Sequence, residues 1–536
     1  MTSDMLERAF RLCLLASLCA TASFAQTPMR GVVWSSDSTP TAADLHRIRQ
    51  AGVQAIRLPL VHDRSLLIEA DSLGLSLFQE LPMRYLTASS LMDSLDSAAS
   101  QLARALELGA GHASAAHYGL ANYSDTSNEA ACSYFTDLAR MADVALNVQV
   151  YYVSPFIESD RCTHTVDFVL LDVRHLPDPS WALDRWPHPA RVGVGALGTA
   201  VTEGAFGLRN LRSPQSQARY FELHLPTLLD APVNAVFVYR WGDNSALHEA
   251  DRWGLLDSLD QLRPAYEVVR GLYTGTQQEF AFPAGKAAQG ETPWLVVVGW
   301  LAILALGLTY AVSISWRNLV HRFLTRHGFY LDSVRMGREF PGIGSLIFML
   351  VQALITGCVC WLVVHTALES RAGEPMLASL SPAMLQIAGR IAGDPGRSTL
   401  LFSGVNLVFQ MALLLAGMSV LSTRGLAGVK RVITLQVSAQ WHVICLLPLI
   451  MVYPSFSQAD LPLITGLTAG GWILAGVFSG VRLVVDYGAV LGPSRRIVAL
   501  FVLMPQALSV TAALAWVLYT PTGASIAYWW HLIVRP

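Results

Sequence analysis

The chain has 536 residues, of which 53% are hydrophobic and 14% are charged, and its formal net charge is −2. An ordinary soluble domain carries about 25% charged residues, so this composition indicates a protein with a large membrane-embedded part. The near-neutral net charge gives no support for a nucleic-acid partner.

The first 25 residues have the organisation of a secretory signal peptide. Arg8 and Arg11 precede an apolar run, and Ser23 and Ala25 are small residues where a signal peptidase reads. We therefore expect cleavage after Ala25, which would place the next domain on the periplasmic or extracellular side. An uncleaved anchor is the alternative, although the run is short for one.

Residues 26–278 alternate short apolar strands with amphipathic helices. The predicted strands are 30–34, 53–60, 75–82, 114–121, 147–153, 167–173, 191–197 and 234–241. Eight strands alternating with helices indicate an α/β fold, a (β/α)₈ TIM barrel. A doubly wound open sheet has the same local pattern, but no glycine-rich phosphate loop follows the first strand to favour it.

A short polar linker is predicted over residues 279–293, followed by an all-α polytopic membrane domain over residues 294–520. The apolar stretches are each long enough to cross a bilayer, which indicates about six spans and a C-terminal tail. They are 294–314, 343–367, 400–421, 433–453, 464–486 and 497–519, with the tail at 521–536. Five spans, with one pair miscounted, is the alternative.

Basic residues are concentrated in the loops that an exported first domain would place in the cytoplasm. These residues are Arg317, Arg322, Arg326, Arg335, Arg338, Arg424, Lys430, Arg431, Arg495 and Arg496. The positive-inside rule therefore supports a multi-pass protein with the predicted barrel outside.

Polar residues within the predicted spans are scattered. Arg482 and Asp486 are four residues apart and are expected to pair on one helical face. Glycines recur along the fifth span at a spacing that lets helices approach closely. We interpret this half as an anchor in the lipid bilayer or an interaction domain for a membrane-protein partner.

The exported region contains only two cysteines, Cys132 and Cys162. An oxidising compartment permits a disulfide between them, and two free buried thiols are the alternative. No Cys/His spacing typical of a zinc site occurs, so we predict neither a metal nor a cofactor.

Function in such a barrel lies at the carboxyl ends of the strands. The residues predicted there are Asp37, Arg57, Glu80, Asn122, Tyr123, Asp172, Glu203 and Asp243, with the aromatics Trp34, Tyr118, Tyr239 and Trp241 nearby. Carboxylates beside flat rings are typical of a sugar site, because the acids can cleave a glycosidic bond and the rings can stack on sugar faces. For Asp37 and Asp243, a helix N-cap or a loop ion pair is an equally good interpretation.

The same region resembles glycoside hydrolase family two, the β-galactosidase and β-glucuronidase group. The segments that carry the resemblance, in chain order, are GVVWSSDSTPTAADLHRIRQAGVQAIRLPLVHDRSLLIEADSLGLSLFQELP, GHASAAHYGLAN, VTEGAFG, SPQSQARYF and GLLDSLDQLRPAYEVVRGLY. The β-sandwich domains that usually precede the barrel in this family have no counterpart before the first predicted strand. The resemblance covers nearly the whole of the predicted barrel.

The resemblance implies a retaining hydrolase with two glutamates, one as nucleophile and one as acid. It places the nucleophile at Glu203 and retains His112 and Asn122, but Tyr123 occupies the acid position. A phenol with a pKa near 10 is a poor general acid at neutral pH. Asp125, Glu129 and Glu80 are the nearest replacements.

Three functional hypotheses follow. The first is a glycosidase that acts on an envelope glycan, with Glu203 as nucleophile and an atypical acid. The second is an inactive barrel, a pseudoenzyme, that binds or senses a glycan. The third is a transporter whose outer barrel is a substrate receptor.

Overall fold

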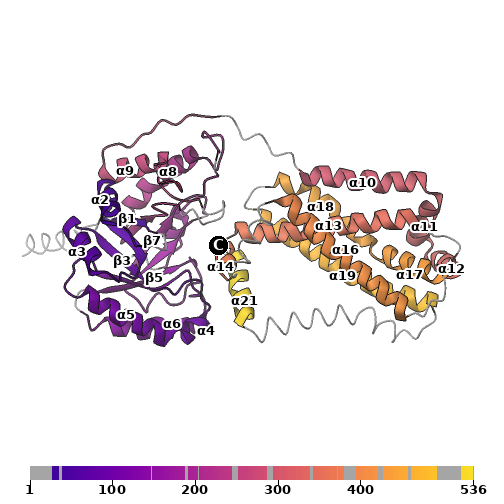
Figure 1. Ribbon diagram of the computed structural model, residues 1–536, viewed down its shortest axis with the longest axis horizontal. Coiled ribbons are helices and arrows are strands. Elements are labelled where there is room, and N and C mark those ends of the chain that lie inside the picture. Colours follow the sequence, from indigo (N-terminus) through magenta and orange to yellow (C-terminus); the bar gives the residue numbers. More distant parts are fainter. Residues whose placement is uncertain are drawn as a thin grey trace, which may run out of the picture. The chain divides into compact units, whose positions relative to one another are not determined.

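The computed structural model describes residues 27–34, 39–145, 148–174, 176–187, 191–202, 204–243, 252–285, 294–337, 342–370, 372–379, 394–420, 426–456, 460–491 and 521–534. The chain divides near residue 288 into two compact units. The first contains all the strands that are described and the second is helical (Figure 1).

The first unit is a closed barrel in which eight parallel strands pair in chain order, β1 with β2 and so on to β8, which pairs back with β1. The strands are β1 (Met29–Val33), β2 (Ala55–Pro59), β3 (Ser76–Glu80), β4 (His117–Asn122), β5 (Gln149–Ser154), β6 (Phe168–Asp172), β7 (Val192–Leu197) and β8 (Ala235–Val238). The predicted TIM barrel is confirmed, and the alternative of an open, doubly wound sheet is wrong.

Helices surround the strands (Figure 1). They are α2 (Ala42–Gln50), α3 (Arg64–Leu73), α4 (Ala88–Asp93), α5 (Leu95–Gly109), α6 (Ala131–Ala142), α7 (Ser180–Asp184), α8 (Pro214–Asp230) and α9 (Pro264–Thr274). Local chemistry sets several of their ends. Thr41 and Asp44 form a reciprocal capping box at the start of α2, and Gly74 ends α3 with a φ of 62°.

The barrel interior is a column of rings with a layer of polar groups above it. Phe78 stacks on His117 with ring centroids 4.1 Å apart, and Phe237 lies edge-on to Phe78 at 4.8 Å. Burial lowers the pKa of His117 to about 4, so the ring is neutral at physiological pH. This packed column leaves function to the rim, the end of the barrel at which the strands terminate.

A disulfide joins Cys132, in α6, to Cys162, in the loop after β5. Beside it, Asp160 accepts hydrogen bonds from the Tyr152 hydroxyl and the Thr126 hydroxyl, each at 2.8 Å. Burial raises the pKa of the Asp160 carboxyl above its ordinary value. The disulfide and this carboxylate together connect the loop after β4 to the loop after β5.

The second unit is built of helices and short 3₁₀ turns. Its elements are α10 (Trp294–Val312), α11 (Ile314–Thr325), α12 (His327–Met336), α13 (Gly342–Glu369), α14 (Gly373–Ala378), α16 (Pro395–Val420), α17 (Leu426–Ala439), η3 (Trp441–Leu446), α18 (Leu447–Val452), η4 (Tyr453–Ser455), α19 (Leu461–Leu491) and α21 (Pro521–Val534).

Five stretches of these helices are long and apolar enough to cross a membrane: Trp294–Val312, Gly342–Glu369, Pro395–Leu415, Val429–Ser455 and Leu463–Val490. They correspond to the first five predicted spans. The sixth predicted span, 497–519, lies outside the described residues. An apolar helical unit of about six spans is therefore consistent with what the structure describes.

Two segments outside the predicted spans also contain helices. The loop predicted between the first two spans contains the helices α11 and α12, whose buried faces carry Trp316, Phe323 and Tyr330. The predicted C-terminal tail contains α21, an apolar helix of 14 residues. Both segments are recognisable as helices from apolar residues at helical spacing, and not from the length of an apolar run.

One mixed-charge cluster is buried in the helical unit. Asp486 is fully buried, and its carboxylate lies 2.9 Å from Nε2 of His327 and 3.4 Å from Nε of Arg482. The predicted Arg482–Asp486 pair therefore forms, and His327 of α12 joins it.

Candidate functional site

The centre of the rim is a chain of three polar side chains from neighbouring strands. Arg57, from β2, lies with its Nε 2.8 Å from Oε1 of Glu80, the last residue of β3. The Asn122 amide, at the end of β4, donates to Oε2 of Glu80 at 2.9 Å. Parallel pairing brings these ends together, so the structure unites three of the predicted site residues.

Glycines on β4 and β7 make room for this chain. A Cβ on Gly119 would lie 2.9 Å from Cζ of Tyr151 and 3.1 Å from Cγ of Glu80, and one on Gly195 would lie 3.1 Å from Nη1 of Arg57. The Gly195 carbonyl also accepts a hydrogen bond from Arg57. Larger residues at either position would displace the ion pair.

Glu80 is the carboxylate at the centre of the chain. Burial raises the pKa of its carboxyl above the ordinary value, against the opposing effect of the Arg57 and Arg84 charges. Its side chain is 14% exposed, although Oε1 itself is buried. A partly accessible carboxyl with a raised pKa has one property of a general acid.

Tyr123 follows Asn122 in a left-handed conformation, with a φ of 54°. Tyr85, in the loop after β3, also has a positive φ, of 60°, and its ring meets the Tyr123 ring edge to face at 5.6 Å. Bulky residues seldom adopt this conformation, and such strain is concentrated at functional sites. Tyr123 is only 3% exposed, whereas Tyr85 is half-buried.

A second ion pair lies at the end of β6. Nη2 of Arg174 lies 2.6 Å from Oδ2 of Asp172, and both side chains are buried. The guanidinium stacks on Tyr239 with its carbon 4.0 Å from the ring centroid, and it lies 5.9 Å from the centroid of Tyr123. Asp172 is thus held by a charge partner beside the tyrosine that occupies the expected acid position.

Asp243 forms ion pairs in a loop, which was the structural alternative to a ligand-binding role. One oxygen lies 2.7 Å from Nη2 of Arg263 and the other 3.1 Å from Nη2 of Arg240. The backbone amides of Trp253 and Gly254 also donate to it at 3.0 and 2.8 Å. These contacts make Asp243 an anchor for the loop after β8.

Three residues predicted to bind ligand face away from the rim. The Tyr118 hydroxyl donates to the Ala105 carbonyl of α5 at 3.1 Å, on the outside of the barrel, and Trp241 packs edge-on against Tyr266 of α9. His112 precedes β4 at the opposite end of the barrel, where its Nδ1 lies 2.7 Å from Asp71. Strand alternation explains Tyr118, because its neighbours His117 and Gly119 take the inward positions.

The other predicted residues divide into those near the rim and those outside the described part of the chain. Trp34 is half-buried at the end of β1, and Tyr239 packs against Arg174. Asp125, after β4, accepts a hydrogen bond from Ser127 at 2.7 Å, and Glu129 is exposed before α6. Asp37 and Glu203 lie outside the described residues.

Sequence reasoning missed the arginines that neutralise the rim. Arg174 follows Asp172 by two residues directly after a buried strand, so an Asp-x-Arg pattern at a strand end was the available signal. Arg240 likewise follows the end of β8 by two residues, whereas Arg84 follows the end of β3 by four. Loop conformation decides which carboxylate each of these arginines meets.

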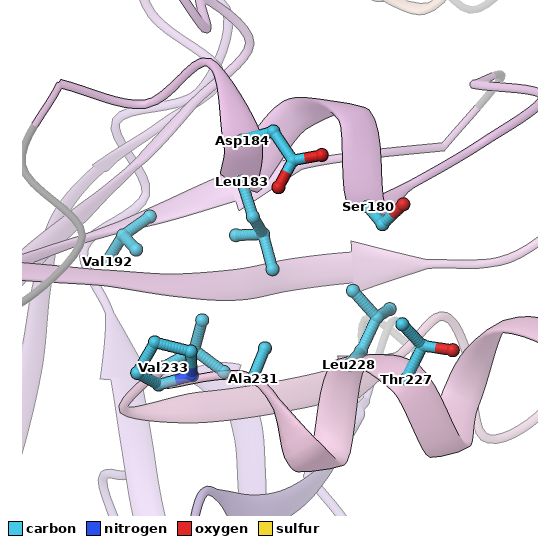
Figure 2. Close-up of a pocket in the computed structure, with 9 residues that line it drawn as sticks. Ser180, Leu183, Asp184, Val192, Thr227, Leu228, Ala231 and Val233 are labelled. Atoms are coloured by element: carbon cyan, nitrogen blue, oxygen red, sulfur yellow. The ribbon is translucent and has the colours of Figure 1, made fainter.

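A small cavity of the barrel lies away from this rim. It measures about 260 Å³ and opens between α7, α8 and the start of β7, where Leu183, Val192 and Leu228 line it (Figure 2). Val192 is the first residue of its strand, so the cavity opens on the flank toward the opposite end of the barrel. Its lining is mostly apolar and offers one carboxylate, Asp184 (Figure 2).

Side chains at the rim can therefore form hydrogen bonds with a ligand and stack against it. The carboxylates described there, however, are largely neutralised by arginines. Glu80, Asp172 and Asp243 each contact arginine within the described residues. Arg84 lies exposed over the half-buried ring of Tyr85, 4.7 Å from its centroid. Among those same residues, no three His, Cys, Asp or Glu side chains gather as metal ligands.

Comparison with known proteins finds similarity only among solved structures. No family model matches the chain, and no curated protein matches it. The barrel half is similar to a family-two β-galacturonidase from Eisenbergiella tayi bound to galacturonate, with 15% identity and a TM-score of 0.42 over 47% of this chain and 52% of that one.

A β-glucuronidase from an uncultured Clostridium species is similar at 15% identity and a TM-score of 0.41, over 46% of this chain and 50% of that one. The Ruminococcus gnavus β-glucuronidase is similar at 15% identity and a TM-score of 0.40, over 47% and 51%. The chain thus spans about half the length of these solved structures. Similarity at this level assigns no activity, and the barrel is established by its own strand pairing.

Proposed function

We propose that the protein is a membrane-anchored, glycoside-hydrolase-like barrel that binds a glycan at its rim without cleaving it. The observation that carries this proposal is the packing of Tyr123, which fills the expected acid position. Its ring contacts Tyr85 and lies near Arg174, and its side chain is almost completely buried. A buried phenol in this setting supplies neither a mobile proton nor space for a carboxylate to replace it.

The neighbouring groups suit recognition of a sugar. Tyr85 presents part of its ring at the rim, with the exposed Arg84 beside it. The Asn122 amide and the Glu80 carboxylate lie one strand apart and can accept or donate hydrogen bonds to hydroxyl groups. A flat ring beside a few fixed polar groups is the usual composition of a small-molecule site.

The spans would anchor the barrel, and the signal-like N-terminus together with the basic loops supports placement of the barrel outside the cytoplasm. The transporter hypothesis receives no support from the buried charges that are described. Asp486 lies near the end of α19 rather than at its middle, and both of its described partners are cationic or protonatable side chains of the same unit.

The test uses the full-length protein purified in detergent micelles. Binding is first screened on an array of envelope and plant glycans, and the best glycan is then titrated by calorimetry against wild type and Tyr85→Ala. We expect Tyr85→Ala to weaken binding at least ~10-fold, because stacking on the exposed part of the ring is lost. The matched control is Trp181→Ala, which removes another arginine-covered ring on α7 and should leave binding unchanged.

Hydrolysis remains the second candidate, and the raised pKa and partial exposure of Glu80 favour it. In that case Glu203 would be the nucleophile and Glu80 the acid. Dinitrophenyl glycosides need little acid assistance, so they report on the nucleophile alone. Their turnover, or a 2-fluoroglycosyl adduct on the peptide that contains Glu203, would overturn the proposal of binding without cleavage.

A further inference from the structure

Two short helices, α11 and α12, follow directly on the first membrane-length helix. Only Ser313 separates the end of α10, at Val312, from the start of α11. Because α10 has 19 residues, which is about the number that crosses the hydrocarbon core, a helix that begins one residue later begins at the boundary of the bilayer. Figure 1 shows α11 and α12 at the end of the helical unit where α10 terminates.

One face of this helix pair, residues 313–337, is packed onto the rest of the helical unit. The ring of Trp316, in α11, lies against that of Phe348, in α13, with centroids 5.2 Å apart. Nη1 of Arg322 donates to the hydroxyl of Ser333 at 2.8 Å, which joins α11 to α12. The ion pair with Asp486 joins α12 to α19. These contacts fix which face of the pair is left exposed.

The exposed face of α11 carries apolar and basic side chains in one stripe. Residues three or four positions apart lie on one side of a helix, and four exposed residues have this spacing: Ile314, Arg317, His321 and Leu324. The apolar ends of the stripe, Ile314 and Leu324, are 63% and 55% exposed. Trp316 lies on the opposite face, where it is buried. The helix therefore has a second amphipathic character, directed away from the helical unit.

α12 continues this exposed surface. Phe329 and Met336 are 64% and 52% exposed, and their separation of seven residues places them on one side of the helix. Arg326, at the junction of the two helices, and Arg335 are exposed as well. In the part of the chain that the structure describes, no carboxylate forms an ion pair with Arg317, Arg326 or Arg335. Their guanidinium groups are therefore available to an external anion.

The charge of the segment is complementary to an anionic surface. Residues 313–337 contain four arginines and one acidic residue, Asp332, so their formal charge is +3 with the histidines neutral. A guanidinium group binds phosphate oxygens through two parallel hydrogen bonds. An inorganic anion would use the arginines alone, whereas exposed apolar side chains require an apolar partner. Basic amphipathic helices meet both partners together in the headgroup layer of a membrane.

We propose that the exposed face of α11 and α12 binds anionic phospholipids in the leaflet that α10 reaches at its C-terminal end. Arg317, Arg326 and Arg335 bind headgroup phosphates, and the side chains of Leu324 and Phe329 insert between the upper acyl-chain segments. The packed face holds the arginines in place before lipid arrives, which reduces the entropy lost on binding. The proposal concerns the helical unit alone and does not rest on a glycan at the rim of the barrel.

The test counts the lipids that the full-length protein retains. The protein in detergent micelles is equilibrated with equimolar phosphatidylglycerol and phosphatidylcholine, and bound lipids are read by native mass spectrometry. We expect wild type to prefer phosphatidylglycerol by at least ~5-fold, the effect of one arginine near an anionic surface. Arg317→Gln/Arg326→Gln/Arg335→Gln should abolish most of this preference. Wild type without a preference, or a triple variant that keeps it, overturns the proposal.

The matched control removes the same charge from another surface. Arg140→Gln/Arg219→Gln/Arg270→Gln replaces three solvent-accessible arginines of the barrel, each paired with a neighbouring acid, and should leave the lipid preference unchanged. The triple lysine variant of the α11–α12 arginines keeps their charge and should retain most of the preference. An equal loss in the barrel variant would mean that net charge, and not this surface, attracts the lipid.

A second measurement needs no variant, so it remains decisive if a substitution prevents folding. Hydrogen exchange of residues 313–337 is compared for wild-type full-length protein in nanodiscs of phosphatidylcholine alone and in nanodiscs with one-third phosphatidylglycerol. We expect exchange ~3-fold slower with the anionic lipid, and a smaller difference at high salt, which screens the charges. Glycerol phosphate, which has no acyl chains, should not reproduce the protection. Equal exchange in both lipids, or equal protection by glycerol phosphate, overturns the proposal.

Discussion

The barrel and the helical unit satisfy their buried polar groups in different ways. In the barrel, carboxylates at the strand ends are met by arginines and backbone amides from loops, as Asp243 illustrates with four such contacts. In the helical unit, hydroxyl groups donate to carbonyls one turn back within the same helix. Examples are Thr309 to Ala305 and Thr468 to Ile464, at 2.6 and 2.7 Å.

The difference follows from the surroundings of each unit. Loops at a water-facing rim can supply donors from any direction, whereas a helix that crosses a bilayer must satisfy its polar groups internally or through a neighbouring helix. The Asp486 cluster uses the second of these routes, because His327 comes from a different helix. Four predictions test how far this contrast extends.

The largest effect is expected at Asp486. Asp486→Ala leaves Arg482 and His327 beside an empty position, and breaking a buried ion pair from one side costs about 3–5 kcal/mol of unfolding free energy. This loss is measured by unfolding the full-length protein in mixed micelles, in a titration with a denaturing detergent. Arg397→Ala is the control, because Asp394 and Arg397 form an exposed pair and its loss should cost about 0–1 kcal/mol. Equal effects of the two changes would contradict a special role for the cluster.

The disulfide should contribute nearly as much unfolding free energy, and it should stabilise the barrel alone. Cys132 and Cys162 are 30 residues apart in sequence, and closing a loop of that size in the unfolded chain is worth about 3–4 kcal/mol. Cys132→Ser/Cys162→Ser should therefore lower the urea midpoint for barrel peptides in hydrogen exchange while leaving those of α13 unchanged. A double variant Cys358→Ser/Cys360→Ser, which removes free thiols, should leave the barrel midpoint in place.

Acid should weaken the barrel through His117. The unfolded ring takes up a proton near its ordinary pKa of 6.5, whereas burial lowers the folded pKa to about 4. Between these values the unfolded state binds more protons, so stability is complete above about pH 6.5 and is lost as the pH falls, by up to about 3 kcal/mol at pH 4. Exchange at the barrel strands as a function of pH measures this slope.

His117→Gln is the matched variant for that slope, because it does not titrate. It should be less stable than wild type at pH 7, and the difference should shrink as the pH falls to 4. A difference that stays constant with pH would mean that His117 does not control acid sensitivity.

The smallest of the four effects is expected from Arg174→Lys. Lysine keeps the charge opposite Asp172 but loses the flat fork and its stacking on Tyr239. We expect a loss of about 2 kcal/mol of barrel stability, the value of one hydrogen bond to a charged group, measured by urea titration. Arg185→Lys is the control, because its pair with Glu158 is about half exposed, and it should cost less than about 0.5 kcal/mol.

Much of the fold was predictable because its signals are local. All eight strands lie at their predicted positions, and the described spans match the apolar stretches, since both patterns are written in consecutive residues. Arg57, Glu80 and Asn122 were predictable as a group for a related reason: Glu80 and Asn122 end parallel strands, Arg57 lies two residues before the end of the next one, and parallel strands end at one face. The helices α11, α12 and α21 are each shorter than a membrane span, so the length of an apolar run does not identify them.

Other features depended on contacts that no local pattern records. Tyr118 and Trp241 have the residue types of a sugar site but point into the packing between the barrel and its helices. His112 belongs to a sequence segment that leads into β4, yet it lies at the opposite end from Asn122. A strand's two ends and two faces differ in function, and a motif match cannot distinguish them.

The sequence by itself determined the division of this protein into an alternating α/β half and an apolar helical half, because hydrophobic periodicity and run length are properties of neighbouring residues. Only the tertiary structure decided which charges meet. Register and loop conformation set three kinds of contact: the arginines that pair with Glu80 and Asp172, the close approach of Gly207 to Gly285, and the histidine that joins Asp486. Register and loop conformation in turn depend on the closure of the barrel and the packing of helices, which bring together residues that are up to 243 positions apart.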